Sequence, residues 1–156
     1  MKAQRTLSLI LFACLLLSAA VAQAGKIKVF VQLKEGHAET PEARQAVKHF
    51  RKAVVRKGLR SFKRKKGVDY VVKLKVNFEQ SKDGAFANVS VLSKAYKPGL
   101  TTMTGYATGM ADPYDPKDGK AAAKSLKQSS EQSANKLAGQ LKQAAAMEKK
   151  KRKAKK

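Results

Sequence analysis

The side chains with the clearest chemical potential are the lysines and arginines between residues 44 and 66. Eleven of these 23 residues are basic and none is acidic. Guanidinium and ammonium groups bind phosphates and carboxylates, whereas a surface that only meets solvent usually mixes both signs of charge. We therefore predict an anion-binding segment; the alternative is a helix face that is polar only because it is solvated. The candidate residues are Arg44, Lys48, Arg51, Lys52, Arg56, Arg60, Lys63, Arg64, Lys65 and Lys66.

A second basic element ends the chain. Seven of the eight residues from 149 to 156 are Lys or Arg, and a block of like charges is normally disordered. We predict a disordered basic tail over residues 148–156, which either adds a second contact to an anion or only keeps the chain soluble. The tail residues assigned to anion binding are Lys149, Lys150, Lys151, Arg152 and Lys153.

The sequence contains no motif for catalysis and none for a metal or cofactor. It has no serine elbow, no HExxH pattern and no phosphate-cradling glycine loop, and its two histidines are His37 and His49. Asp112, Asp115 and Asp118 repeat at every third position, but this spacing differs from that of an EF-hand loop. Turn formation, with Asp118 as a helix N-cap, explains the same residues. We therefore predict a binding protein rather than an enzyme.

The first 24 residues have the three parts of a secretory signal peptide. Lys2 and Arg5 give a basic start, residues 7–17 are apolar, and Ala22-Gln23-Ala24 forms a small-residue cleavage site before Gly25. The apolar run is short for a transmembrane helix. The sequence thus predicts export to the periplasm or the extracellular space.

The single cysteine, Cys14, lies within the apolar part of this segment. Residues 11–14 loosely resemble a lipobox, so lipidation of Cys14 is the alternative to cleavage after Ala24. Cleavage leaves no cysteine, and the fold then depends on a hydrophobic core. With a formal net charge of +23, the chain attracts polyanions; outside the cytoplasm these include lipopolysaccharide, anionic lipids, cell-wall polymers and DNA. A basic exported chain of this kind is typical of bacteria.

Two helices are expected. The first begins at Thr40-Pro41-Glu42, which combines an N-cap, a first-turn proline and an acidic group, and it ends before Gly58. Apolar residues at three- and four-residue spacing give it one apolar face. The second runs from residue 118 to 147 and is rich in Ala and Lys. Because its apolar stripe is thin, we expect a long, loosely docked helix. The stripe consists of Leu126, Ser130, Ser133, Leu137 and Leu141.

Alternating apolar residues predict strands at residues 27–33, 70–78 and 85–96, with a weaker fourth strand at 100–110. Lys82-Asp83-Gly84 is a turn signal that makes the second and third strands a hairpin. The predicted order is β-α-β-β-β-α. This order indicates a single α+β domain over residues 25–147, with a three- to four-stranded antiparallel sheet and the first helix on one face.

Basic and aromatic side chains are expected together on one face of this sheet. The residues that share it are Lys26, Lys28, Phe30, Lys73 and Lys75. Such a face could stack nucleobases. We expect instead that the C-terminal helix covers Phe30.

Three short segments of this arrangement are informative about its relatives. They are Asp69-Tyr70-Val71-Val72, Val89-Ser90-Val91-Leu92 and Gly105-Tyr106-Ala107-Thr108-Gly109. With the predicted order of elements, they resemble small periplasmic α+β domains over roughly Lys26 to Leu141, namely the TolB amino-terminal domain and the LpoB-like lipoprotein activators. This resemblance implies a non-enzymatic interaction domain of the cell envelope, without naming a partner.

Two functional hypotheses follow. The first is an exported protein that contacts polyanions, or an anionic envelope surface, through its basic helix, loop and tail. The second is an envelope interaction or assembly domain whose partner is a protein. Steep loss of binding with salt favours the first, and salt-tolerant capture of one protein favours the second.

Overall fold

The computed structural model describes residues 26–36 and 39–154. The predicted signal peptide and the alternative lipidation site, Cys14, lie outside the described residues. Within them the chain forms five strands and two helices. In chain order these are β1 (Lys28–Leu33), α2 (Pro41–Arg56), β2 (Arg60–Phe62), β3 (Tyr70–Gln80), β4 (Ala87–Tyr96), β5 (Met103–Met110) and α3 (Gly119–Ala154). The α+β class and the long C-terminal helix are confirmed.

Helix α2 begins and ends where the sequence predicts. The Thr40 hydroxyl accepts a hydrogen bond from the Ala43 N–H at 3.1 Å, which satisfies one of the free donors of the first turn. Gly58, at φ +83°, follows the last turn in the left-handed conformation that glycine tolerates best. Phe50 is fully buried on the apolar face of the helix.

The sheet has the strand order β2-β1-β3-β4-β5. It differs from the prediction in two ways: it has five strands, and β1 runs parallel to both β2 and β3. The sequence suggested a loop after residue 58, because three residues are too few to display an alternating pattern. The parallel pairing follows from α2, which returns the chain to the end of the sheet from which β1 started.

The second half of the sheet matches the sequence prediction. Strands β3 and β4 form an antiparallel hairpin, and β5 pairs antiparallel with β4. Asp118 caps α3, since its carboxylate accepts hydrogen bonds from the N–H groups of Lys120 and Ala121 at 2.9 and 3.1 Å.

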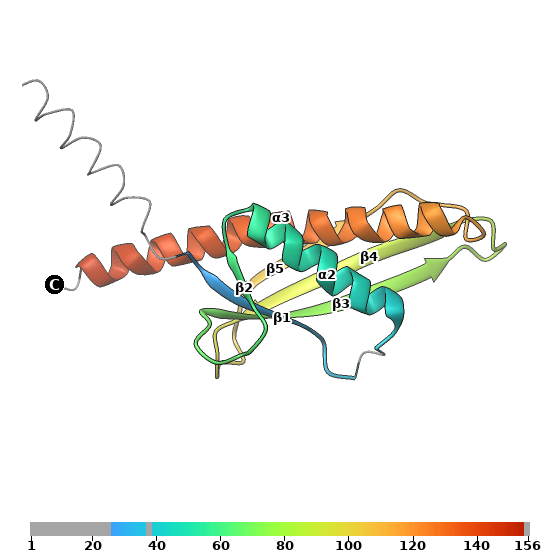
Figure 1. Ribbon diagram of the computed structural model, residues 1–156. Helices are drawn as coiled ribbons and strands as arrows, with labels where there is room; N and C mark the ends of the chain where they lie inside the picture. The colour runs from blue at the N-terminus through green and yellow to red at the C-terminus, as the bar shows by residue number, and fades with distance from the viewer. Residues whose placement is uncertain (1–25, 37–38, 155–156) are drawn as a thin grey trace, which may run out of the picture.

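Both helices cover the same face of the sheet (Figure 1), and one apolar core fills the space between the layers. All five residues of the predicted stripe on α3 are buried. The prediction of loose docking is wrong, because small residues bring α3 very close to β5. The buried Ser93 and Ser133 hydroxyls lie 2.8 Å apart, and both reach the Ala107 carbonyl.

Side chains of α3 also form hydrogen bonds with the backbone N–H and carbonyl groups on the outer edge of β5. Gln140 accepts from the Tyr106 N–H at 2.8 Å, and Gln132 accepts from the Met110 N–H at 3.1 Å. Lys136 donates to the Thr108 carbonyl at 3.1 Å. One helical ridge at four-residue spacing therefore blocks an edge that would otherwise attract another strand.

The basic C-terminal segment is helical as far as residue 154, although the sequence suggested a disordered tail from residue 148. Helix α3 continues through it to Ala154, and its end projects beyond the sheet (Figure 1). Lys97 and Glu148 form an ion pair at 2.6 Å that ties this end to the β4–β5 connection. Positive charges in the last turn also favour a helix, because they face the negative end of its dipole.

Candidate functional site

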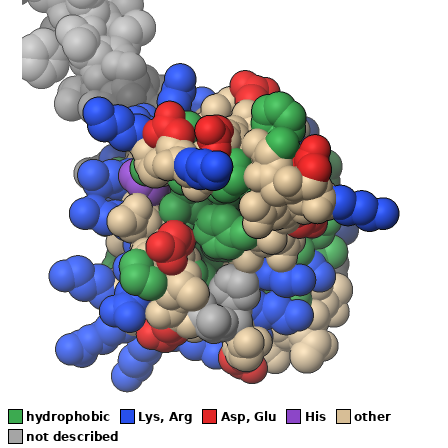
Figure 2. Space-filling view, turned by 90° about the vertical axis from the view of Figure 1, so that its right-hand side faces the viewer, with side chains coloured by type: hydrophobic (Ala, Val, Ile, Leu, Met, Phe, Trp, Pro, Cys, Tyr) green, Lys and Arg blue, Asp and Glu red, His purple; other side chains and the backbone are tan. Residues whose placement is uncertain are grey.

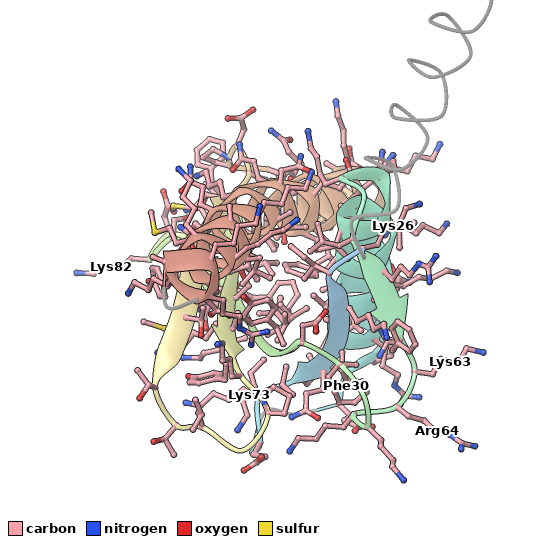
Figure 3. All side chains as sticks on the ribbon, turned by 90° about the vertical axis from the view of Figure 1, so that its left-hand side faces the viewer. Lys26, Phe30, Lys63, Arg64, Lys73 and Lys82 are labelled. Atoms are coloured by element: carbon pink, nitrogen blue, oxygen red, sulfur yellow. The ribbon has the colours of Figure 1, made fainter. Side chains whose placement is uncertain are left out.

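The face of the sheet that neither helix covers, called here the open face, is basic and aromatic. Phe30 and Lys73 lie on it and point away from α3 (Figure 3). Strand pairing and alternation place further side chains on the same face. These are Lys28, Gln32, Phe62, Val71, Lys75, Leu92, Lys94, Tyr96, Tyr106 and Thr108. The expectation that the C-terminal helix covers Phe30 is therefore wrong.

The loop of residues 63–69 crosses the open face near one end. Strands β2 and β3 lie on opposite sides of β1 and run in the same direction, so their connection must pass over β1 on the face without helices. Val68 in this loop and Val71 on the open face are 7% and 3% exposed, although neither belongs to the main core. The crossing thus buries a small apolar area and leaves the middle of the open face uncovered.

In that middle region, lysines stand directly opposite one another. Lys73 of β3 pairs in register with Lys94 of β4, and Lys75 is the next residue of β3 on the same face. Three lysine side chains therefore project from neighbouring positions on the same face of the sheet.

Aromatic rings on the open face lie next to these lysines. The Lys28, Lys73 and Lys94 ammonium groups lie 6.0, 5.9 and 6.0 Å from the ring centres of Phe62, Tyr96 and Tyr106, respectively. Such cation–π contacts stabilise a charged side chain in one position. The rings of Phe62, Tyr96 and Tyr106 are thus already in contact with positive charges.

Two neighbouring cavities hold most of these groups. The open-face cavity has a volume of about 280 Å³ and is lined by Lys34, Glu35, Lys73, Lys75, Leu92, Lys94 and Tyr96. The edge cavity has a volume of about 600 Å³ and is lined in part by Lys34, Arg44, Arg51 and Lys63, together with the carboxylates of Glu35 and Glu39. The two cavities share Lys34 and Glu35 in their linings. Together they are called here the basic groove, which extends from β4 around β1 to α2.

The predicted residues of α2 do not all lie in this groove. Arg44 does, whereas Lys48 and Lys52 are exposed elsewhere on the helix. Arg56 forms an ion pair with Glu131 of α3 at 2.6 Å. The half-buried His49 has a lowered pKa, chiefly because burial disfavours its charged form.

Arg51 differs from the prediction of a solvated side chain. It is half-buried, and its guanidinium donates to the Val31 carbonyl at 2.6 Å. This carbonyl lies on β1 beyond the last β1–β2 pair, Phe30 and Phe62. The buried Arg51 Nε has no hydrogen-bond partner within the described part of the chain. Arg51 therefore acts as a cap for the β1 edge as well as a charge beside the groove.

The predicted residues of the loop and of the C-terminal segment lie in different places, and those of the C-terminal segment are outside the groove. Lys63 and Arg64 project outward on the β2 side, away from Lys73 (Figure 3), and Arg60, Lys65 and Lys66 are exposed. Lys149 and Arg152 line a separate cavity of about 270 Å³ beside Tyr70, whose pKa is raised chiefly by burial. Lys150, Lys151 and Lys153 are exposed on the projecting end of α3.

The opposite end of the molecule, at the β3–β4 turn, exposes large apolar side chains. Phe78 and Phe86 are 50% and 58% exposed there. Viewed from this end, hydrophobic side chains lie near the centre, acidic side chains are scattered around them, and lysines and arginines project mainly from the rim (Figure 2).

Sequence reasoning missed Lys94, Tyr96 and Tyr106 as site residues. Lys94 and Tyr96 alternate with buried residues of β4, so they could have been assigned to the face of Lys73. The register that puts Lys94 opposite Lys73 depends on where the hairpin turns, which the sequence indicates only approximately.

Among residues 26–36 and 39–154, His, Cys, Asp and Glu side chains form no group of three or more that could hold a metal ion. No helix in the same ranges combines the length and apolar character needed to cross a membrane.

Two solved structures of bacterial proteins have a similar fold. The PelC dodecamer from Paraburkholderia phytofirmans is 17% identical with a TM-score of 0.53, covering 72% of this chain and 89% of that chain. A protein from Xanthomonas campestris described by the family model DUF330 is 15% identical with a TM-score of 0.53, covering 80% and 89%. At such identities the likeness concerns the fold alone. No family model matches the sequence, and no curated protein matches it. The resemblance to TolB and LpoB-like domains stays a prediction.

Proposed function

We propose that this protein is an exported, non-enzymatic binding protein that holds polyanions in the basic groove. The observation that carries the proposal is that Lys34, Lys73, Lys75 and Lys94 line one cavity with a single carboxylate, that of Glu35. Arg44 and Lys63 extend the positive charge into the adjoining cavity. A chain of phosphates or carboxylates lying in this groove would meet lysine or arginine along its length.

The geometry favours contact with the anionic groups of the polymer over recognition of nucleobases. Tyr96 and Tyr106 already contact the Lys73 and Lys94 ammonium groups, which leaves these ring faces less accessible for stacking. Binding through ammonium groups alone positions a polymer without distinguishing its sequence. We therefore infer weak sequence preference and strong dependence on salt.

The test is a fluorescence anisotropy titration with a labelled DNA duplex and with heparin at several salt concentrations. For about six anionic contacts, affinity is expected to fall on the order of a thousandfold between about 50 and 200 mM salt. Replacing Lys73, Lys75 and Lys94 by Gln together is expected to reduce both affinity and salt slope. The charge-matched control replaces Lys117, Lys120 and Lys124, which are exposed near the start of α3. Equal losses in the two triple variants, or binding that ignores salt, would reject the groove.

A second candidate is an envelope assembly domain, favoured by the exposed Phe78 and Phe86 at the hairpin end. The structural neighbour PelC is a dodecamer, so this fold is compatible with assembly. Analytical ultracentrifugation of the wild type and of Phe86→Ser tests it: a concentration-dependent oligomer that Phe86→Ser dissociates supports assembly, and a monomeric wild type contradicts self-assembly.

Export is part of the proposal and rests on the signal-peptide pattern of residues 1–24. The protein isolated from its native cells is expected to begin at Gly25. Mass spectrometry of the N-terminus checks this. A chain that begins at a lipidated Cys14 would point to membrane anchorage, and one that retains Met1 to Ala24 would contradict cleavage.

A further inference from the structure

The arrangement of lysines in the open-face cavity is unfavourable for a protein that binds nothing there. Lys73 and Lys94 are directly opposite across β3 and β4, and like charges at such positions destabilise a sheet. Lys34 and Lys75 add two more positive charges to the same cavity. Residues that destabilise the local structure, without a structural benefit elsewhere, are expected at functional sites.

The backbone and the rings hold these charges in place. The Lys34 N–H donates to the Leu74 carbonyl at 2.7 Å, which fixes the chain after β1 beside β3. The rings of Tyr96 and Tyr106 support the Lys73 and Lys94 ammonium groups. Because this order exists in the free protein, an anion that enters the cavity would lose less affinity to side-chain ordering than one bound by free surface lysines.

Glu35 partly neutralises the cavity. Its carboxylate accepts from the Lys73 ammonium at 3.2 Å, and the Glu35 side chain is 84% exposed. So exposed an ion pair contributes little to stability, and a stronger anion can displace it. The carboxylate occupies the position that an incoming oxyanion would take beside Lys73.

The charge of the cavity indicates the size of its ligand. Four ammonium groups and one carboxylate leave an excess of three positive charges, whereas a terminal diphosphate, whose outer phosphate is not esterified, carries about three negative charges at neutral pH. A single carboxylate would leave most of this excess unpaired.

We propose that the open-face cavity binds a diphosphate group, with Lys73 and Lys94 as its principal ligands and Glu35 as a built-in competitor for Lys73. The inference rests on the proposed anion-binding function and names the chemical group that this part of the groove accepts. The diphosphate could be the terminal group of a soluble nucleoside diphosphate or of a diphosphate lipid, because both present the same unesterified outer phosphate.

The test is isothermal titration calorimetry of the purified protein with inorganic pyrophosphate at low salt. Lys73→Gln and Lys94→Gln are each expected to weaken binding about tenfold, because each removes a charge-assisted contact. Glu35→Gln is expected to strengthen binding several-fold, which no folding defect could produce. Inorganic phosphate is expected to bind more weakly than pyrophosphate.

Lys117→Gln and Lys120→Gln are the matched controls, since each removes one positive charge from an exposed position near the start of α3, outside the cavity. Both are expected to leave pyrophosphate affinity within about twofold of the wild type. Uridine diphosphate and phosphatidylcholine vesicles containing a polyprenyl diphosphate then distinguish the soluble source from the lipid source.

Losses in Lys73→Gln and Lys94→Gln no greater than in the controls would overturn the diphosphate site, as would weaker binding by Glu35→Gln. If salt-dependent heparin binding persists in that case, only the diphosphate inference fails. If the wild type binds neither heparin nor DNA at low salt, the proposed function fails.

Discussion

Gly109 of β5 lies so close to Ser129 of α3 that a Cβ atom built on it would stand 1.9 Å from the Ser129 carbonyl oxygen. The contact is with helix backbone, which cannot rotate away as a side chain does. Glycine at this position therefore determines how near α3 approaches the sheet, and with it how tightly the buried serines pack.

Gly109→Ala is expected to destabilise the protein by about 3 kcal/mol or more, because α3 must shift away from β5. Gly139→Ala is the control: the site is open, with no atom within 4 Å of the added Cβ, and alanine is the better helix former there by up to about 1 kcal/mol. Urea unfolding followed by circular dichroism measures both. A Gly109→Ala protein as stable as the wild type would contradict the close approach of α3 to the sheet.

Arg51→Ala is expected to cost about 1 to 3 kcal/mol, since it leaves the Val31 carbonyl without its partner. Lys52→Ala, on the exposed surface of the same helix, is expected to change stability by less than about 0.5 kcal/mol. The comparison uses thermal and denaturant unfolding of both variants. Equal effects would mean that Arg51 is held no more firmly than its solvated neighbour.

Replacing Gln132 and Gln140 by Leu is expected to promote association, because the Tyr106 and Met110 N–H groups lose their acceptors and the β5 edge becomes open to another strand. The matched Glu variant keeps an acceptor of nearly the same shape and is expected to stay as dispersed as the wild type. Light scattering against protein concentration distinguishes them. Identical behaviour of the Leu and Glu variants would argue against edge protection.

The lowered pKa of His49 predicts how the stability of the protein changes with pH. Its pKa is lowered from 6.5, first by burial and then by Lys127, Lys52 and Lys48, while Glu131 acts in the opposite direction. The unfolded chain therefore binds a proton at higher pH than the folded chain does, and stability falls as the pH drops below 6.5.

Urea midpoints measured above and below pH 6.5 in wild type and His49→Gln check this expectation. The midpoint of the wild type is expected to drop toward lower pH, and that of His49→Gln to drop less. A steeper drop in the variant would reverse the assigned sign. His37 lies outside the described residues and is the same in both proteins.

The sequence predicts local structure well where the structure depends on residues that are close together in the sequence. Thr40 and Gly58 delimit α2, and Asp118 begins α3, because caps act within one turn of the helix. The β3–β4 hairpin follows from alternation and a turn at Gly84, whose φ is +71°.

Properties that depend on distant pairing were not predicted. The three residues of β2 owe their strand conformation to β1, and the parallel direction of β1 depends on the path of the whole chain. The set of residues that forms the site also depends on pairing between strands that are distant in the sequence. Lys73 and Lys94 are 21 positions apart in the sequence and become neighbours only through register, so a search for clustered charges finds α2 and the loop first.

The position of β1 between β2 and β3 imposes an order on folding. Strands β3, β4 and β5 are connected by short turns and can pair locally, whereas β1 must find β3 across the intervening helix and loop, and such non-local pairing is slow. The β3 edge therefore stays unpaired until β1 docks. During this interval a newly synthesised chain would present the unpaired edge of β3 at Val72 and Leu74 to its surroundings, which makes the docking of β1 the step that competes with aggregation.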